Sequence, residues 1–338
     1  MPKGVHWMVK SPYSIGSQHA TWWHLLKLRA TLLDALQNPE VNAVLVTHGT
    51  DSMEEVLFFL YLTIPPDLIT KPVVFTGSML PSDAPQSDAQ TNLADAIACV
   101  IGALGNNLPG KPMHPEKTVH TVKCLPRALF GLAMNGHFTP APWVEKHHAT
   151  ALGAFNGEHS VALTAPLQGH LTGLAASGNA LQHLAGQWAS ANAFDMWTRS
   201  EQRAVALFQT GRIELLYCHV GANYQSLTQH LLQSTVVSSS SGTHQARVAI
   251  SRQTVVVAAY GNGSLPNALV PELRALLQSG WRVVKHTRVP AAILATKTGE
   301  LTELDAYKAA DSWAVFEAAP PVSLPKLLVL EGLRAAFP

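Results

Sequence analysis

Two kinds of apolar segment alternate along this chain, and the alternation constrains the fold more than any other feature. The first segment along the chain is predicted to be an amphipathic helix over 22–36, which Pro39 ends. After it the pattern predicts, in order, a strand, a helix, a strand and a helix, at 41–46, 53–62, 72–76 and 92–104. Strands that alternate with helices favour a parallel sheet with helices on both sides, so we expect an α/β fold.

The alternation breaks twice, which indicates two domains. Residues 102–127 hold several Gly and Pro and predict a surface loop, and the weakly periodic stretch 185–210 predicts a linker. Further elements are predicted as strands at 129–134, 213–217 and 255–259 and as helices at 227–233 and 268–279, the last capped by Gly280. We therefore expect a parallel-sheet N-terminal domain over 1–195 and a smaller α/β domain over 212–338.

Composition excludes several classes of function. Of the 338 residues, 47% are hydrophobic and 13% are charged, and the net charge is +1. A globular protein with so little net charge is not expected to bind nucleic acid or an anionic membrane. No apolar run is long enough to cross a bilayer, and the first residues do not form a signal peptide. The 3 cysteines lie far apart, so we expect no disulfide, no metal site and a cytoplasmic location.

The segment 44–55 carries the most functional information. A buried strand runs into a glycine turn and then into a helix, which puts Thr50 and Asp51 at the carboxyl end of a strand. Ligands of open parallel sheets bind at that end, and the first N–H groups of the helix favour an anion there. Asp51 followed by Glu54 is also a helix-capping pattern, and the local pattern alone favours that role. The two roles are compatible.

Six segments, taken together, resemble one family. T-H-G-T-D-S-M-E-E at 47–55 is similar to the T-H-G-T-D-T-M-E-E signature of bacterial-type L-asparaginases, with Ser52 in place of a threonine. The other five follow in the family's order. They are the I-G-S-Q turn within 14–18, the strand and loop at 71–84, the lysine segment at 145–155, the glycine turn at 259–264 and the strand end at 288–290.

The resemblance implies a reaction on a linear amide. It is the hydrolysis of L-asparagine to L-aspartate and ammonia, with L-glutamine as a second substrate and with no metal or organic cofactor. Thr50 then supplies a hydroxyl, and Lys146 acts as its base once desolvation favours the neutral amine. Asp51 pairs with Lys146 or holds the substrate's α-amino group. Without the resemblance, Lys146 reads as a solvated charge beside Glu145.

The resemblance also implies substrate-binding residues. Ser17 and Gln18 are expected to hold the substrate's α-carboxylate and α-amino groups, and Gly49 lies in the same signature turn. Asn262 is a good turn residue between two glycines. In the family, however, a residue of this turn and a later acid, matched here by Glu300, reach the active site of a neighbouring subunit. We therefore expect a homotetramer.

One family feature is absent from this sequence. Asparaginases have a T-G-G-T-I stretch that carries the usual nucleophile, and the I-G-S-Q turn normally follows it by several tens of residues. Here that turn begins at Ile15. Three interpretations follow: a longer natural protein, a degraded paralogue or non-catalytic amino-acid-binding homologue, or a Thr50–Lys146 pair that acts alone. We expect the chain as given to have far less activity than a complete family member.

Overall fold

The structure is a computed structural model that describes residues 5–104, 129–157, 159–163, 212–239, 253–261, 263–289, 317–318 and 322–336. The chain forms two compact units, Met1–Glu201 and Gln202–Pro338. Most of the predicted loop at 102–127 and all of the predicted linker at 185–210 lie outside the described residues; only 102–104 are described, as the end of a helix. No described helix is long and apolar enough to span a membrane.

The first unit is built on a five-stranded sheet. Its strands are β1 (Val44–Thr47), β2 (Val73–Thr76), β3 (Phe130–Met134), β4 (His137–Pro140) and β5 (Val161–Ala162), paired in that order. The first three strands run parallel, as the alternation predicts, whereas β4 and β5 are antiparallel to their neighbours.

The antiparallel strands were not predicted, although the sequence carries a signal for the first of them. Met134 pairs with His137, and the two residues between them are Asn135 and Gly136. Both have positive φ, at 50° and 69°. Asn-Gly is the preferred pair for a two-residue hairpin turn, because both positions need positive φ there. The chain therefore reverses after β3, and the sheet is mixed.

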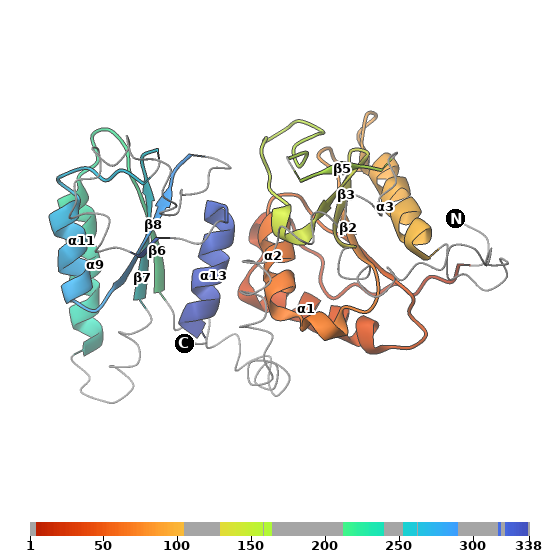
Figure 1. The fold of residues 1–338 in the computed structure, drawn as a ribbon, viewed down its shortest axis with the longest axis horizontal. Coiled ribbons are helices and arrows are strands. Elements are labelled where there is room, and N and C mark those ends of the chain that lie inside the picture. Colours follow the sequence, from red (N-terminus) through yellow and green to blue (C-terminus); the bar gives the residue numbers. More distant parts are fainter. Residues whose placement is uncertain are drawn as a thin grey trace, which may run out of the picture. The chain divides into compact units, whose positions relative to one another are not determined.

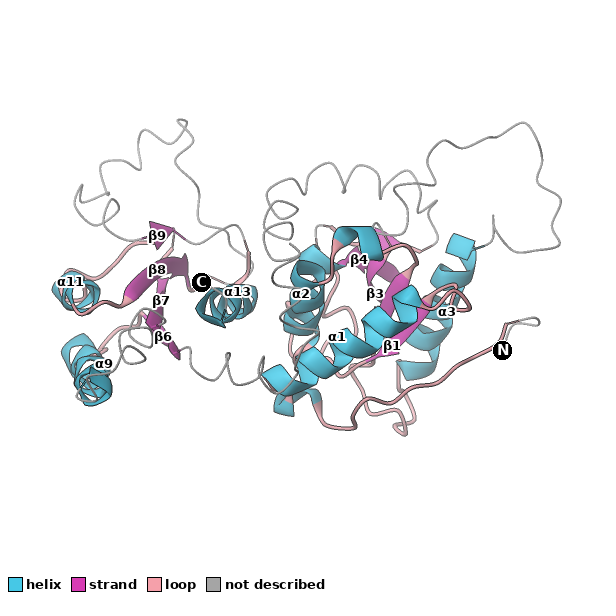
Figure 2. Cartoon of the chain, turned by 90° about the horizontal axis from the view of Figure 1, so that it is seen from below, coloured by secondary structure: helices cyan, strands magenta, loops and turns pink. Residues whose placement is uncertain are grey.

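Helices cover both faces of this sheet. They are α1 (Trp22–Gln37), α2 (Met53–Thr63) and α3 (Ala89–Leu104). Three short 3-10 turns lie before α1, after α2 and after β4: η1 (Ser17–His19), η2 (Pro66–Leu68) and η4 (Ala141–Trp143). Figures 1 and 2 show α2 and α3 on opposite sides of the strands. On the α3 side, Val74 and Ala133 pack against Ala96 and Cys99. On the α2 side, Tyr61 lies against the ring of Phe130.

Helix α2 is almost completely buried. Ten of its eleven residues are buried, and Trp22 of α1 lies against Phe59 on it. A helix that is apolar on nearly all sides needs neighbours all round. Because α2 begins directly after the signature turn, this packing holds the turn in a rigid frame.

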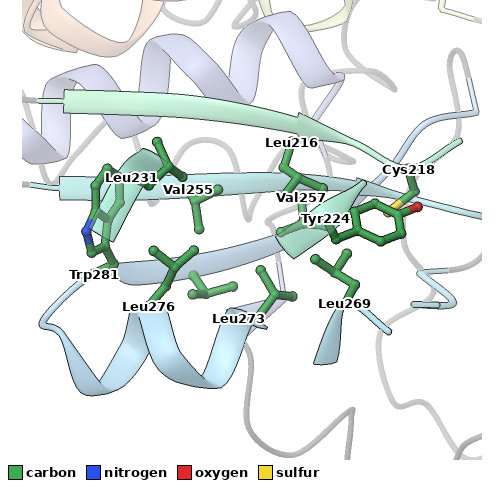
Figure 3. Close-up of a cluster of buried hydrophobic side chains, with 11 residues drawn as sticks. Leu216, Cys218, Tyr224, Leu231, Val255, Val257, Leu269, Leu273, Leu276 and Trp281 are labelled. Carbon is green, nitrogen blue, oxygen red and sulfur yellow. The ribbon is translucent and has the colours of Figure 1, made fainter. Parts of the chain in front are cut away.

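The second unit has a parallel sheet of β6 (Arg212–Tyr217), β7 (Gln253–Ala259), β8 (Arg282–Thr287) and β9 (Glu317–Ala318), paired in that order. Helices α9 (Tyr224–Ser239) and α11 (Val270–Gln278) cover one face, and α13 (Leu324–Ala336) covers the other (Figure 2). Figure 3 shows the core between the sheet and α9 and α11, a cluster that includes Leu216 and Val257 of the sheet, Leu231 of α9 and Leu273 of α11.

Gly280 ends α11 as predicted. Its φ is 87°, the left-handed conformation that favours glycine. The Gly280 N–H donates to Leu277 O, and the Trp281 N–H donates to Leu276 O, both at 3.0 Å. These two bonds are the Schellman pattern, which satisfies carbonyls at the helix end. Trp281 then enters the core shown in Figure 3.

Candidate active site

The signature turn connects β1 to α2 at the carboxyl end of the parallel strands. The His48 N–H still donates to Thr76 O at 2.9 Å, which extends the pairing of β1 with β2 by one residue. The chain then turns through Gly49–Ser52, and α2 begins at Met53. Burial lowers the pKa of His48, whose Nδ1 lies 2.8 Å from Gly49 O, so this imidazole is neutral at pH 7.

The structure brings Thr50, Asp51 and Lys146 together. Lys146 Nζ lies 3.2 Å from Thr50 Oγ1 and 2.8 Å from Asp51 Oδ1. The side chain of Lys146 is 18% exposed and that of Asp51 is 56% exposed. The lysine therefore lies against the signature turn, as the resemblance implies, and not in solvent beside Glu145.

Ser17 fixes the same turn from another segment. The Asp51 N–H donates to Ser17 Oγ at 3.1 Å, and Ser52 Oγ donates to Ser17 O at 2.8 Å. Ser17 is buried, and it begins the 3-10 turn η1. The hydroxyl of Ser52 thus ties two distant segments together. Ser17 therefore lies in the predicted cluster, but its hydroxyl and its carbonyl oxygen already accept hydrogen bonds from the signature turn.

Gly49 is required by the close approach of Ser17. A Cβ added at Gly49 would lie 2.6 Å from Ser17 Oγ and 2.8 Å from Ser17 Cβ. Both distances are shorter than real Cβ contacts, so a side chain here would push the two segments apart. The glycine of the signature therefore has a packing reason that is independent of any substrate.

The capping interpretation of Asp51 is wrong. The residue that precedes α2 is Ser52, and no side chain there makes a capping hydrogen bond. Glu54 does not complete a capping box with Asp51. Its Oε2 instead accepts the backbone N–H of Lys146 at 2.6 Å. The tertiary contact with the lysine segment has replaced the local bond that the pattern predicts.

Glu55 differs sharply from its neighbour. Its Oε2 is buried and has no hydrogen-bond partner among the described residues. Burial raises the pKa of Glu55 to about 7, the negative charges of Glu54 and Asp51 add to the rise, and Lys146 opposes it. Two adjacent glutamates of the signature thus have different environments, and no local feature of the sequence distinguishes them.

The other predicted residues lie elsewhere or outside the described part. Gln18 is exposed, and its amide nitrogen lies 3.4 Å from His19 Nε2. Asn262 and Glu300 lie outside the described residues. Within the described ranges, no group of three or more His, Cys, Asp or Glu could hold a metal.

The arrangement supplies the parts of a nucleophile–base pair. A hydroxyl and an amine lie within hydrogen-bond reach, which is the geometry that proton transfer from the hydroxyl needs. The exposed Asp51 carboxylate orients the amine on one side and can accept a cationic group from solvent on the other. An α-ammonium group is a cation of suitable size for that second contact.

Comparison with known proteins gives a family profile over the part of the chain that holds the signature, and relatives that match part of the chain. The family profile described as "Asparaginase, N-terminal" matches residues 3–110. A glutaminase-asparaginase from Acinetobacter glutaminasificans is 44% identical over 84 residues, or 25% of this chain and 24% of that protein. A probable L-asparaginase from Deinococcus radiodurans is 35% identical over 155 residues, or 46% of this chain and 40% of that protein. The matched region thus spans less than half the length of either relative.

The fold extends the likeness beyond these regions. The crystal structure of a probable cytoplasmic L-asparaginase from Campylobacter jejuni matches with a TM-score of 0.60 at 20% identity. The match covers 97% of this chain and 81% of that chain. Both units of the chain are therefore included in a shared fold, and at this identity the likeness concerns the fold alone.

Proposed function

We propose that the chain is an amidohydrolase that converts L-asparagine to L-aspartate and ammonia, because the asparaginase N-terminal profile matches residues 3–110. L-Glutamine is the second substrate, because one of the relatives is a glutaminase-asparaginase. The observation that carries the proposal is the position of Lys146 Nζ, 3.2 Å from Thr50 Oγ1 and 2.8 Å from Asp51 Oδ1.

The proposed reaction uses the three residues in sequence. In the reactive form Lys146 has lost one proton from its ammonium to solvent. Its amine then accepts the proton of the Thr50 hydroxyl, and Thr50 Oγ1 attacks the carbonyl carbon of the side-chain amide. The C–N bond breaks, and the leaving nitrogen takes a proton from Lys146 to depart as ammonia. Water then hydrolyses the ester, which releases L-aspartate and restores Thr50. Asp51 orients the amine and holds the substrate's α-ammonium group.

A second candidate is an amino-acid-binding protein without turnover. The 56% exposure of the Asp51 side chain favours it, because a carboxylate open to solvent can bind an α-ammonium group whether or not Thr50 reacts. The bonds from Ser17 to the turn would hold that carboxylate in place in a binder as well.

One pair of measurements separates the two candidates. Ammonia release from L-asparagine is followed for the full chain and for Thr50→Ala, and binding of L-asparagine is measured by calorimetry on the same samples. An amidohydrolase releases ammonia, and the Ala variant loses that activity while it keeps its fold. A binder shows heat of binding that Asp51→Ala abolishes, with no ammonia from any variant.

Location and assembly are part of the same proposal. A reducing cytoplasm suits the thiols of Cys99 and Cys218, which are free and buried. A homotetramer suits the family resemblance, in which Asn262 and Glu300 serve a neighbouring subunit. Light scattering tests the assembly, and a stable, active monomer would contradict it.

A further inference from the structure

The backbone of the lysine segment is anchored to helix α2 by one side chain. Residues 144–150 form neither helix nor strand, so no regular hydrogen-bond pattern holds Lys146 in place. Nearby N–H groups donate to residues a short way along the chain, Val144 N to Ala141 O and His147 N to Ala154 O. The Lys146 N–H instead donates to Glu54 Oε2 at 2.6 Å, across 92 residues of chain.

This bond is well placed to be strong. Glu54 is 6% exposed, and it belongs to the first turn of the almost fully buried α2. A hydrogen bond to a carboxylate is stronger than one between neutral groups, and a low-dielectric surrounding strengthens it further. The rigid frame of α2 thus reaches the lysine backbone directly.

The same short stretch therefore holds Lys146 at both ends. Thr50 and Asp51 accept hydrogen bonds from the Lys146 ammonium, and Glu54 accepts one from the Lys146 backbone N–H. A lysine side chain has four carbons and many rotamers, so its tip finds one place only if its Cα is held. Misplacement of a catalytic group by about 1 Å costs roughly a hundredfold in rate.

We infer that Glu54 is the positioning residue of the site: through its bond to the Lys146 backbone it sets the reach of the lysine amine to Thr50. The inference rests on the proposed function for its consequence in catalysis, and on the geometry alone for the placement of the lysine. Glu55, the next residue, makes no such bond among the described residues and serves as the matched control.

The first experiment needs no activity. Amide hydrogen exchange at Lys146 and the acetylation rate of its amine by acetic anhydride are measured by mass spectrometry on the full chain. Glu54→Ala removes the acceptor, and we expect at least about tenfold faster amide exchange, since one buried bond is lost. We also expect the Lys146 amine of this variant to be acetylated several times faster than in the unmodified chain. Glu54→Gln keeps an acceptor oxygen at the same reach and should retain most of the protection.

Two controls keep this test sharp. At about pH 5, where the Glu55 carboxyl is already neutral in the folded chain, Glu55→Gln should leave exchange at the Lys146 amide unchanged. Glu54→Asp keeps the charge but withdraws the oxygen by one methylene, so it should lose protection while the chain stays folded, even if Glu54→Ala does not fold. Equal protection in Glu54→Asp, Glu54→Gln and the unmodified chain would overturn the inference, whatever the activity.

The second experiment tests the consequence in catalysis. If the chain hydrolyses L-asparagine, Glu54→Asp should lower kcat by about a hundredfold with little change in KM, because binding groups stay in place while the base moves. Glu54→Gln should recover most of kcat. A higher KM with an unchanged kcat in Glu54→Asp would contradict positioning of the base. Absence of activity in the unmodified chain would count against the proposed function alone, since the exchange and acetylation results stand without it.

Discussion

The ammonium of Lys146 lies 2.8 Å from Asp51 Oδ1, although 95 residues separate the two in the chain. Asp51 follows the parallel strand β1, and Lys146 lies in an irregular segment after the antiparallel strand β4. The contact therefore depends on the mixed character of the first sheet. The Asn-Gly hairpin after β3 returns the chain across the sheet, and η4 then delivers the lysine segment to α2.

Lys146→Met should abolish function with little cost in stability. The variant keeps the length of the side chain and removes the base, so ammonia release should fall by at least about a hundredfold. The Asp51 side chain is 56% exposed, so loss of the ion pair should cost about 1 kcal/mol or less in the free energy of unfolding. Ammonia assays and urea denaturation check both. Glu145→Gln, one residue earlier, is the control and should leave ammonia release unchanged.

Gly49→Ala should strain the contact between the signature turn and η1. The added Cβ would meet Ser17 Oγ at 2.6 Å and Ser17 Cβ at 2.8 Å. We expect a loss of about 1–3 kcal/mol in the free energy of unfolding, typical of overpacking. In a Ser17→Gly background the same change should cost clearly less, because both clashing atoms are gone. Additive effects in this double-mutant cycle would show that the clash is not the cause.

Glu55→Gln should change the pH dependence of stability. The folded-state pKa of Glu55 is about 7, above the ordinary 4.5, because the buried carboxyl favours its neutral form. Its contribution to stability is therefore fully present below pH 4.5 and is lost as the pH rises to about 7. Gln stays neutral, so the variant should gain stability relative to the unmodified chain over this window, by about 3 kcal/mol at most. Denaturation at several pH values measures the difference, and a difference that does not vary with pH would contradict the assignment.

Gly280→Ala should destabilise the second unit through the backbone. The φ of Gly280 is 87°, where a Cβ meets the carbonyl oxygen of the residue. An alanine there should cost about 1–2 kcal/mol in the free energy of unfolding. Ser279→Ala is the matched control, because the φ of Ser279 is −87° and suits any residue. Thermal denaturation of both variants tests the claim, which fails if the two lose the same stability.

Local features of the sequence determined most of the regular structure. The helix at 22–36 was predicted from periodicity and lies at Trp22–Gln37, and the helix predicted at 53–62 lies at Met53–Thr63. Periodicity succeeds because the face that a residue presents depends only on its near neighbours in the chain. The stop at Gly280 was predictable for the same reason, since one backbone conformation needs one residue type. The signature turn was also recognisable from its residues alone.

Tertiary structure decided what the side chains of that turn contact. The local pattern assigned Asp51 and Glu54 to a helix cap, but Asp51 meets the Lys146 ammonium and Glu54 meets the Lys146 backbone. Glu54 and Glu55 are chemically identical neighbours, and only the packing of α2 makes one an acceptor and leaves the other buried with an unpaired oxygen among the described residues. The orientation of α2 about its axis and the reversal of the chain after β3 place these groups. Both result from the summed packing of distant segments. No short stretch of sequence contains that information.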